Sequence, residues 1–159
     1  MLQTVPVQPA DEEFLYQVYA GTRRDEVFAW GWNEAQQEAF LRMQFLARSR
    51  SYQWAYPHAD HRVILCDGCP VGQLLVNRAE QEIRLVDIAL LPEYRGKGLG
   101  FALVRELQAE AAEAATPIRL QVDKGNPARA LYERLGFAVT GENELTCVMA
   151  WHPQPDELR

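Results

Sequence analysis

The stretch that decides the fold is residues 87–100, which read DIALLPEYRGKGLG. Its first half is an apolar run that we expect to end a strand over residues 83–91. Pro92 closes that strand because it has no N–H for the ladder and biases the preceding residue toward extended conformations. A long helix is expected over residues 98–115, with leucines and alanines on one face and charged residues mostly on the other. A glycine-rich loop therefore joins the end of a strand to the start of a helix.

The loop itself reads RGKGLG over residues 95–100 and has the chemistry of a phosphate site. Glycines leave backbone N–H groups open, and the start of a helix adds unpaired donors and a partial positive charge. Arg95 and Lys97 can supply neutralising charge. The loop lacks both the Lys-Ser/Thr pair of a P-loop and the glycine spacing of a dinucleotide fingerprint. A simple turn needs one glycine, so three glycines alternating with basic residues favour phosphate binding.

Upstream of the loop, the sequence predicts an antiparallel meander of strands over residues 62–66, 71–77 and 83–91. A first strand is expected over 4–8, where Pro6 favours an edge position. Helices are expected over 11–19 and from Asn33, which can act as N-cap. The apolar repeat of the second helix consists of Ala35, Ala39, Met43, Leu46 and Ala47. Its arginines, Arg42, Arg48 and Arg50, are expected to stay in water.

Downstream, a strand over residues 118–122 follows the long helix, so it should run parallel to strand 83–91 through a right-handed crossover. Another helix begins with Asn126 as N-cap and Pro127 at its first position, and Gly136 stops it in the left-handed conformation. Residues 137–140 and 145–151 read as a closing hairpin. The prediction is one α+β domain over residues 1–152, with a mixed central sheet of six to seven strands and about four helices, and a tail over 153–159.

Composition excludes several classes of function. The formal net charge of −6 argues against binding to a phosphate backbone. No apolar run approaches the roughly 20 residues of a membrane span, and residues 1–10 lack a signal peptide pattern. Three cysteines suit a reducing compartment, so we expect a cytoplasmic protein without nucleic acid or membrane partners. Cys66 and Cys69 flank the turn dipeptide Asp67-Gly68, which favours a hairpin, and no metal site is predicted.

Two motifs resemble signatures of the GNAT acetyltransferase superfamily. Residues 95–100 resemble its acyl-CoA-binding signature Q/R-x-x-G-x-G/A, with Arg95, Gly98 and Gly100 in the fixed positions. Residues 126–137, NPARALYERLGF, are similar to its second signature, which ends in L-Y-x-x-x-G-F. The resemblance implies a fold in which the two central parallel strands splay apart at their carboxyl ends, so that the pantetheine arm pairs with the strand ending at Leu90 and Leu91. The implied cofactor-binding residues are Ile88, Leu90, Leu91, Arg95, Gly96, Lys97, Gly98, Leu99, Gly100, Asn126, Arg129 and Tyr132.

The same resemblance implies an N-acetyltransferase that moves an acetyl group from acetyl-CoA to a primary amine by direct attack in a ternary complex. The N–H of Leu90 would polarise the thioester carbonyl, and Tyr132 would protonate the leaving thiolate. Asp87 is a candidate general base, although strand alternation points it away from Ile88 and Leu90. Glu82 and a water relay remain alternatives for that role. The alternative function is a non-catalytic acyl-CoA-binding or sensing module.

The acceptor is an amine that the sequence does not identify. We expect the N-terminal helices and the aromatic stretch that follows them to form its pocket. The candidate lining residues are Arg23, Arg24, Asp25, Glu26, Trp30, Trp32, Tyr52, Trp54 and Tyr56. The acidic net charge mildly favours a cationic acceptor. A homodimer is a further partner arrangement that the sequence allows.

Overall fold

The computed structural model describes residues 1–154. Within that span, seven strands are hydrogen-bonded in the order β1-β2-β3-β4-β5-β7-β6 and four α-helices connect them. The strands are β1 (Leu2–Pro6), β2 (Asp60–Cys66), β3 (Cys69–Arg78), β4 (Ile83–Leu90), β5 (Ile118–Asp123), β6 (Ala138–Glu142) and β7 (Thr146–Trp151). The helices are α1 (Glu12–Phe28), α2 (Glu34–Ala55), α3 (Leu99–Ala114) and α4 (Ala128–Arg134), with short 3-10 turns η1 (Pro9–Asp11) and η2 (Pro92–Tyr94). This is the mixed α+β architecture that the sequence predicts.

The chain forms two compact units. The first consists of Met1–Leu75 and Asp87–Lys97, and the second of Val76–Val86 and the chain from Gly98 onward. Strands β3 and β4 each contribute residues to both units. The single domain over residues 1–152 stays a prediction, and residues 155–159 of the expected tail lie outside the described residues.

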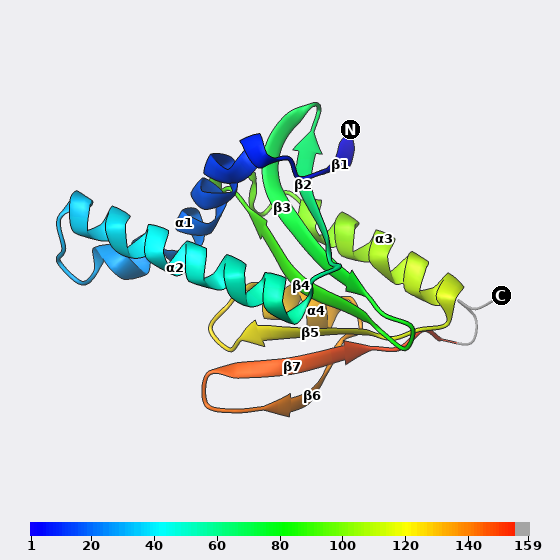
Figure 1. Cartoon of the computed structure of the whole chain (residues 1–159). Helices are drawn as coiled ribbons and strands as arrows, with labels where there is room; N and C mark the ends of the chain where they lie inside the picture. Colours follow the sequence, from blue (N-terminus) through cyan, green and yellow to red (C-terminus); the bar gives the residue numbers. More distant parts are fainter. Residues whose placement is uncertain (155–159) are drawn as a thin grey trace. The chain divides into compact units, whose positions relative to one another are not determined.

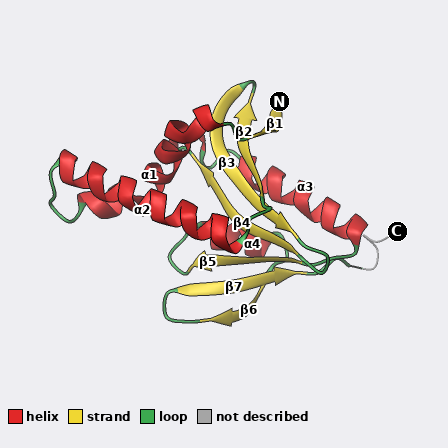
Figure 2. Ribbon diagram, viewed as in Figure 1, coloured by secondary structure: helices red, strands yellow, loops and turns green. Residues whose placement is uncertain are grey.

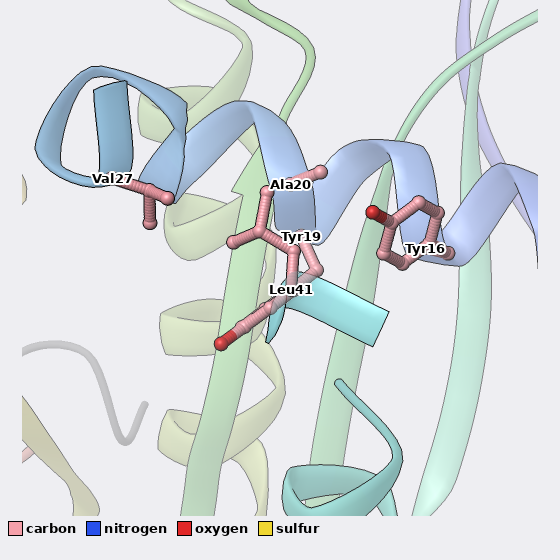
Figure 3. Packing of buried hydrophobic residues seen from close by; sticks show 5 residues of the cluster. All are labelled: Tyr16, Tyr19, Ala20, Val27 and Leu41. Carbon is pink, nitrogen blue, oxygen red and sulfur yellow. The ribbon is translucent and has the colours of Figure 1, made fainter. Parts of the chain in front are cut away.

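In the first unit, α1 and α2 pack on each other through the cluster Tyr16, Tyr19, Ala20, Val27 and Leu41 (Figure 3). Helix α1 runs to Phe28, nine residues beyond the expected end at residue 19, because this buried face continues at helical spacing. Asn33 caps α2 as predicted, since its side chain accepts a hydrogen bond from the Gln36 N–H at 2.8 Å. Strand β1 is an edge strand, paired antiparallel with β2, and Pro6 ends it.

The face of α2 that packs inward is opposite to the face that the sequence predicts. Met43 is 57% exposed and Leu46 43% exposed, and the three alanines of the predicted repeat are exposed too. The helix instead buries Leu41 and packs Phe45 on α1, with ring centroids 5.7 Å from Tyr16 and 5.9 Å from Tyr19. Aromatic rings bury more area than alanine or methionine, so the aromatic face takes the interior position.

In the second unit, β5 lies between β4 and β7 (Figure 2). The first three residues of β4 pair parallel with the first three of β5, from Ile83↔Ile118 to Leu85↔Leu120, which confirms the predicted parallel pair. Strand β7 pairs antiparallel with both β5 and β6, which confirms the closing hairpin. Helix α3 connects β4 to β5 and has left-handed residues, Gly98 and Ala115, at its two caps (Figure 1).

The Cys66–Cys69 segment is a hairpin turn, as predicted. Asp67 and Gly68 both have positive φ, 52° and 81°, as a two-residue type I′ turn requires. Cys66 and Cys69 are free thiols, as is Cys147. Among residues 1–154, no cluster of three or more histidine, cysteine or acidic side chains is arranged to hold a metal ion. Over the same residues, no helix combines the length and apolarity needed to cross a bilayer.

Candidate active site

The glycine loop leaves β4 through η2 and turns twice in the left-handed region. Gly96 has a φ of 72° and Gly98 a φ of 82°, where an L-residue is strained. A Cβ atom added at either position would meet nothing within 4 Å. The glycines are therefore required by backbone conformation rather than by crowding. The space in front of them is open.

Backbone donors and cationic side chains follow one another along this part of the chain. Helix α3 begins at Leu99, and its first hydrogen bond runs from the Ala102 N–H to the Gly98 carbonyl at 3.0 Å. The preceding amides at the start of the helix have no partner one turn earlier. Arg95 and Lys97 are both exposed on the loop. Backbone donors and cationic side chains of this kind suit a diphosphate.

At the end of β4, the backbone N–H and carbonyl of Leu90 point away from β3. The Leu91 N–H donates to the Val71 carbonyl at 2.8 Å, so the backbone groups of Leu90 point to the opposite edge of the strand. There the Leu90 carbonyl accepts a hydrogen bond from Arg95 Nε at 3.1 Å. Gly72 lets β3 approach closely, because a Cβ at this position would lie 2.3 Å from the Ala89 carbonyl oxygen. Leu90 is thus held in a defined orientation, with its backbone groups on the edge of β4 that faces away from β3, and its role toward a cofactor stays a prediction.

Asp87 lies in a buried polar network that the sequence does not reveal. Its side chain is 14% exposed, and one carboxylate oxygen pairs with Arg48 of α2 at 2.9 Å. The other oxygen accepts a hydrogen bond from Gln73, whose Oε1 lies 2.6 Å from His61 Nε2. Burial raises the pKa of Asp87, while the Arg48 guanidinium acts in the opposite direction. Both oxygens are engaged, so the carboxylate ties α2 to the sheet, and its role as a general base stays a prediction.

Arg48 was expected in water, and no local signal in the sequence announces its partner 39 residues away. Glu82, the alternative base, pairs with Arg119 at 3.0 Å and lies just before the first residue of β4, at the end opposite to Leu90.

The second signature forms α4 and its flanks. Tyr132 is 5% exposed, and its ring centroid lies 5.7 Å from that of Phe137. The helix begins at Ala128, two residues after Asn126, and the Asn126 side chain accepts a hydrogen bond from the Ala128 N–H at 2.9 Å. A Cβ at Gly100 would lie 3.5 Å from Leu131 Cδ2, so the first turn of α3 and α4 are neighbours within the second unit. Arg129 pairs with Glu133 one turn along α4 at 3.1 Å.

A pocket of about 360 Å³ lies in the first unit, between α1 and the start of the glycine loop. Its lining residues are Gln17, Gly21, Arg24, Asp25, Leu91, Pro92 and Arg95. Arg24 and Asp25 are among the predicted acceptor residues, whereas Gln17 and Gly21 are not. A glycine inside a helical pattern could have signalled Gly21, because its missing side chain leaves room for Pro92, 3.2 Å from the place of a Cβ.

The other predicted acceptor residues are distributed over the first unit. Trp30 and Trp32 form an edge-to-face cluster with Phe40, at centroid distances of 5.2–5.4 Å. Arg23 pairs with Glu26 on the same helix. Tyr52 accepts a hydrogen bond from Arg48. Tyr56 is the C-cap residue that follows α2, and Trp54 is 88% exposed.

The model of the acetyltransferase (GNAT) family matches residues 15–137. The chain belongs to the GNAT family. The matched range runs from α1 through Phe137, so it includes both the glycine loop and the second signature. Membership agrees with the resemblance drawn from those two motifs.

Two GNAT relatives share local sequence with the chain. The ribosomal protein bS18-alanine N-acetyltransferase of Haemophilus influenzae is 33% identical over 86 residues, which is 54% of this chain and 56% of that protein. The mycothiol acetyltransferase of Nocardiopsis dassonvillei is 36% identical over 111 residues, 69% of this chain and 29% of that protein. The match thus spans about half or less of the length of these curated relatives.

The GNAT fold is also shared with solved structures. The PaiA N-acetyltransferase of Thermoplasma acidophilum, solved in complex with coenzyme A, superposes with a TM-score of 0.69. The superposition covers 96% of this chain and 99% of that one at 19% identity. At this identity the likeness concerns the fold.

Proposed function

We propose that this chain transfers an acetyl group from acetyl-CoA to a primary amine by direct attack in a ternary complex. The observation that carries the proposal is the loop of residues 95–100. Its two left-handed glycines face open space, and its last residues begin α3 with unpaired amides. Such a cradle fits the diphosphate of coenzyme A. Family membership and the names of the two sequence relatives support the acetyl donor.

The candidate cofactor-binding and catalytic residues have the following proposed roles. Arg95, Lys97 and the amides from Gly96 to Gly100 bind the diphosphate, and Leu90 and Ile88 offer backbone groups to the pantetheine arm. Leu91 adjoins them, but its own N–H and carbonyl are bonded to Val71 and Tyr94. Asn126 and Arg129 add polar contacts beside α4. Acetyl-CoA supplies the activated acetyl group when bound. The Leu90 N–H polarises the acetyl carbonyl, and Tyr132 gives its proton to the departing sulfur.

The step that the side chains support least is removal of the proton from the amine, because both carboxylates proposed as its base are already bonded. Asp87 is held by Arg48 and Gln73, and Glu82 is held by Arg119. A water relay therefore joins Asp87 as a candidate base. The cytoplasm is the proposed compartment, because three free thiols suit reducing conditions.

Calorimetric titration with acetyl-CoA tests the loop. Gly98→Glu puts a carboxylate into the proposed diphosphate site, and we expect it to abolish measurable binding by charge repulsion. Gly68→Glu is the matched control, because Gly68 also has a positive φ, 81°, and open space around it but lies in the β2–β3 turn. The control should lose stability to a similar extent and bind acetyl-CoA like the parent. Equal affinity of Gly98→Glu and the parent would remove the loop from the mechanism.

A panel of amines and peptides with a free N-terminus separates the enzyme from the sensing module. We expect acetyl-CoA to lose its acetyl group, with release of free thiol, only in the presence of an acceptor. Tight acetyl-CoA binding without thiol release on any acceptor would favour the sensing module.

A further inference from the structure

One wall of the pocket between α1 and the glycine loop carries two opposite charges side by side. Arg24 and Asp25 are consecutive on α1, and both line this pocket of about 360 Å³. In the described part of the chain, neither forms an ion pair, and Arg24 bonds only to the side chain of Gln17. Both charges are therefore available to a ligand that enters the pocket.

Arg24 differs from an ordinary solvated arginine because a chain of hydrogen bonds fixes its position. Arg42 of α2 donates twice to Glu13, at 3.0 Å each. The same carboxylate accepts from Gln17 Nε2 at 3.1 Å, so the amide oxygen of Gln17 is left to accept from Arg24 Nη2 at 3.0 Å. The guanidinium is thus held on the pocket wall with its remaining N–H donors free. A planar guanidinium held in this way suits a carboxylate.

The pocket adjoins the strand end where the acetyl group is proposed to lie. Arg95, which lines the pocket, donates through Nε to the Leu90 carbonyl at 3.1 Å. Its Nη2 lies 3.9 Å from the place of a Cβ at Gly21, so this side chain lies between α1 and the end of β4. Leu91 and Pro92 supply the apolar part of the lining. A molecule in the pocket would therefore be close to the Leu90 backbone.

We propose that this pocket binds the acceptor and that the acceptor is a free α-amino acid, with its carboxylate on Arg24 and its ammonium group beside Asp25. The inference rests on the proposed acetyl transfer and names its substrate class. The volume is near the lower end of the roughly 300–1,000 Å³ of small-molecule pockets, which fits one amino acid better than a peptide segment. A purely cationic amine would bring like charge to Arg24.

The transfer to such an acceptor balances as follows. The amino nitrogen forms a bond to the acetyl carbon, the carbon–sulfur bond breaks, and coenzyme A leaves as its thiol. The ammonium group loses two protons, of which one ends on the sulfur and the other goes to water. The carboxylate takes no part in the bond changes, so Arg24 is a binding residue that sets specificity.

Turnover of matched acceptors tests the role of the carboxylate. The probes are the L-amino acids with a primary amine, each compared with its C-terminal amide, and thiol release measures kcat/KM. We expect Arg24→Gln to lower kcat/KM for the acids at least about 10-fold and to leave that for the amides unchanged, because only the acids lose a charge-assisted bond. Arg105→Gln, at an exposed position of α3, is the matched control and should change neither. Equal effects of Arg24→Gln on acids and amides would overturn the inference while leaving acetyl transfer intact.

Calorimetry separates this inference from the proposed function. L-amino acids titrated into the chain saturated with coenzyme A find no acetyl group, so their binding is measured without turnover. We expect the Kd to rise at least about 10-fold in Arg24→Gln and in Asp25→Asn. Binding of this kind without thiol release from acetyl-CoA would refute the transfer and support the pocket. Absence of binding would overturn the inference even if other amines are acetylated, and so would a loss of acetyl-CoA affinity in Arg24→Gln, which would assign Arg24 to the donor.

Discussion

Tyr132 is a buried ring whose hydroxyl has a chemical task in the proposed reaction. We expect Tyr132→Phe to lower kcat by roughly 100-fold or more, because general acid catalysis commonly contributes that much. The affinity for acetyl-CoA should change little, since the ring and its contact with Phe137 remain. Steady-state kinetics and calorimetry on the same preparation measure the two quantities.

Tyr16→Phe controls for the loss of a hydroxyl from a buried tyrosine. Tyr16 is fully buried and donates to Glu38 at 2.9 Å in the α1–α2 cluster. This variant should lose about 1 kcal/mol of stability and keep its turnover. Equal turnover of Tyr132→Phe and the parent would return Tyr132 to a packing role.

At the scale of elements, one ion pair fastens α2 to β4 immediately before the residues proposed to hold the acetyl group. Arg48→Met should lower the free energy of unfolding by about 2–3 kcal/mol, because it leaves the carboxylate of Asp87 buried without its cation. Urea unfolding measures this loss. Asp87→Asn in the same background should recover most of it, since a neutral amide oxygen can still accept from Gln73.

Arg129→Met is the matched control for an ion pair on a helix. Its partner Glu133 is 55% exposed, so we expect a loss below about 0.5 kcal/mol. An Arg48→Met loss as small as this would show that α2 is held by its aromatic contacts alone.

At the scale of the whole molecule, binding of the donor should be visible as stability. A ligand that binds only the folded chain raises the free energy of unfolding by about 2.7 kcal/mol at 100 times its Kd. We therefore expect acetyl-CoA to raise the thermal unfolding midpoint of the parent and of Gly68→Glu, increasingly with concentration. Gly98→Glu should show no shift. A shift of equal size in Gly98→Glu would mean that acetyl-CoA binds elsewhere.

Much of this architecture could be predicted from the sequence because the signals are local. Asp67-Gly68 favours a turn with two positive φ angles, and Gly96 and Gly98 supply left-handed conformations in the glycine loop. Asn33 caps α2, which begins at the next residue. Each of these depends on a few neighbouring residues. The order of strand, glycine loop, helix and strand was enough to predict a parallel pair, which β4 and β5 form.

The surroundings of the site were decided by contacts between residues distant in the chain. Arg48 reaches Asp87 across 39 positions, and α2 turns inward whichever face buries the larger rings. The sequence by itself determined the family, most of the elements and the left-handed turns of the glycine loop, because backbone geometry and capping are encoded within a turn or two. Only the tertiary structure decided which charges are paired, which face of α2 meets water and which residues line the pocket, because these depend on competition among side chains for the same buried space.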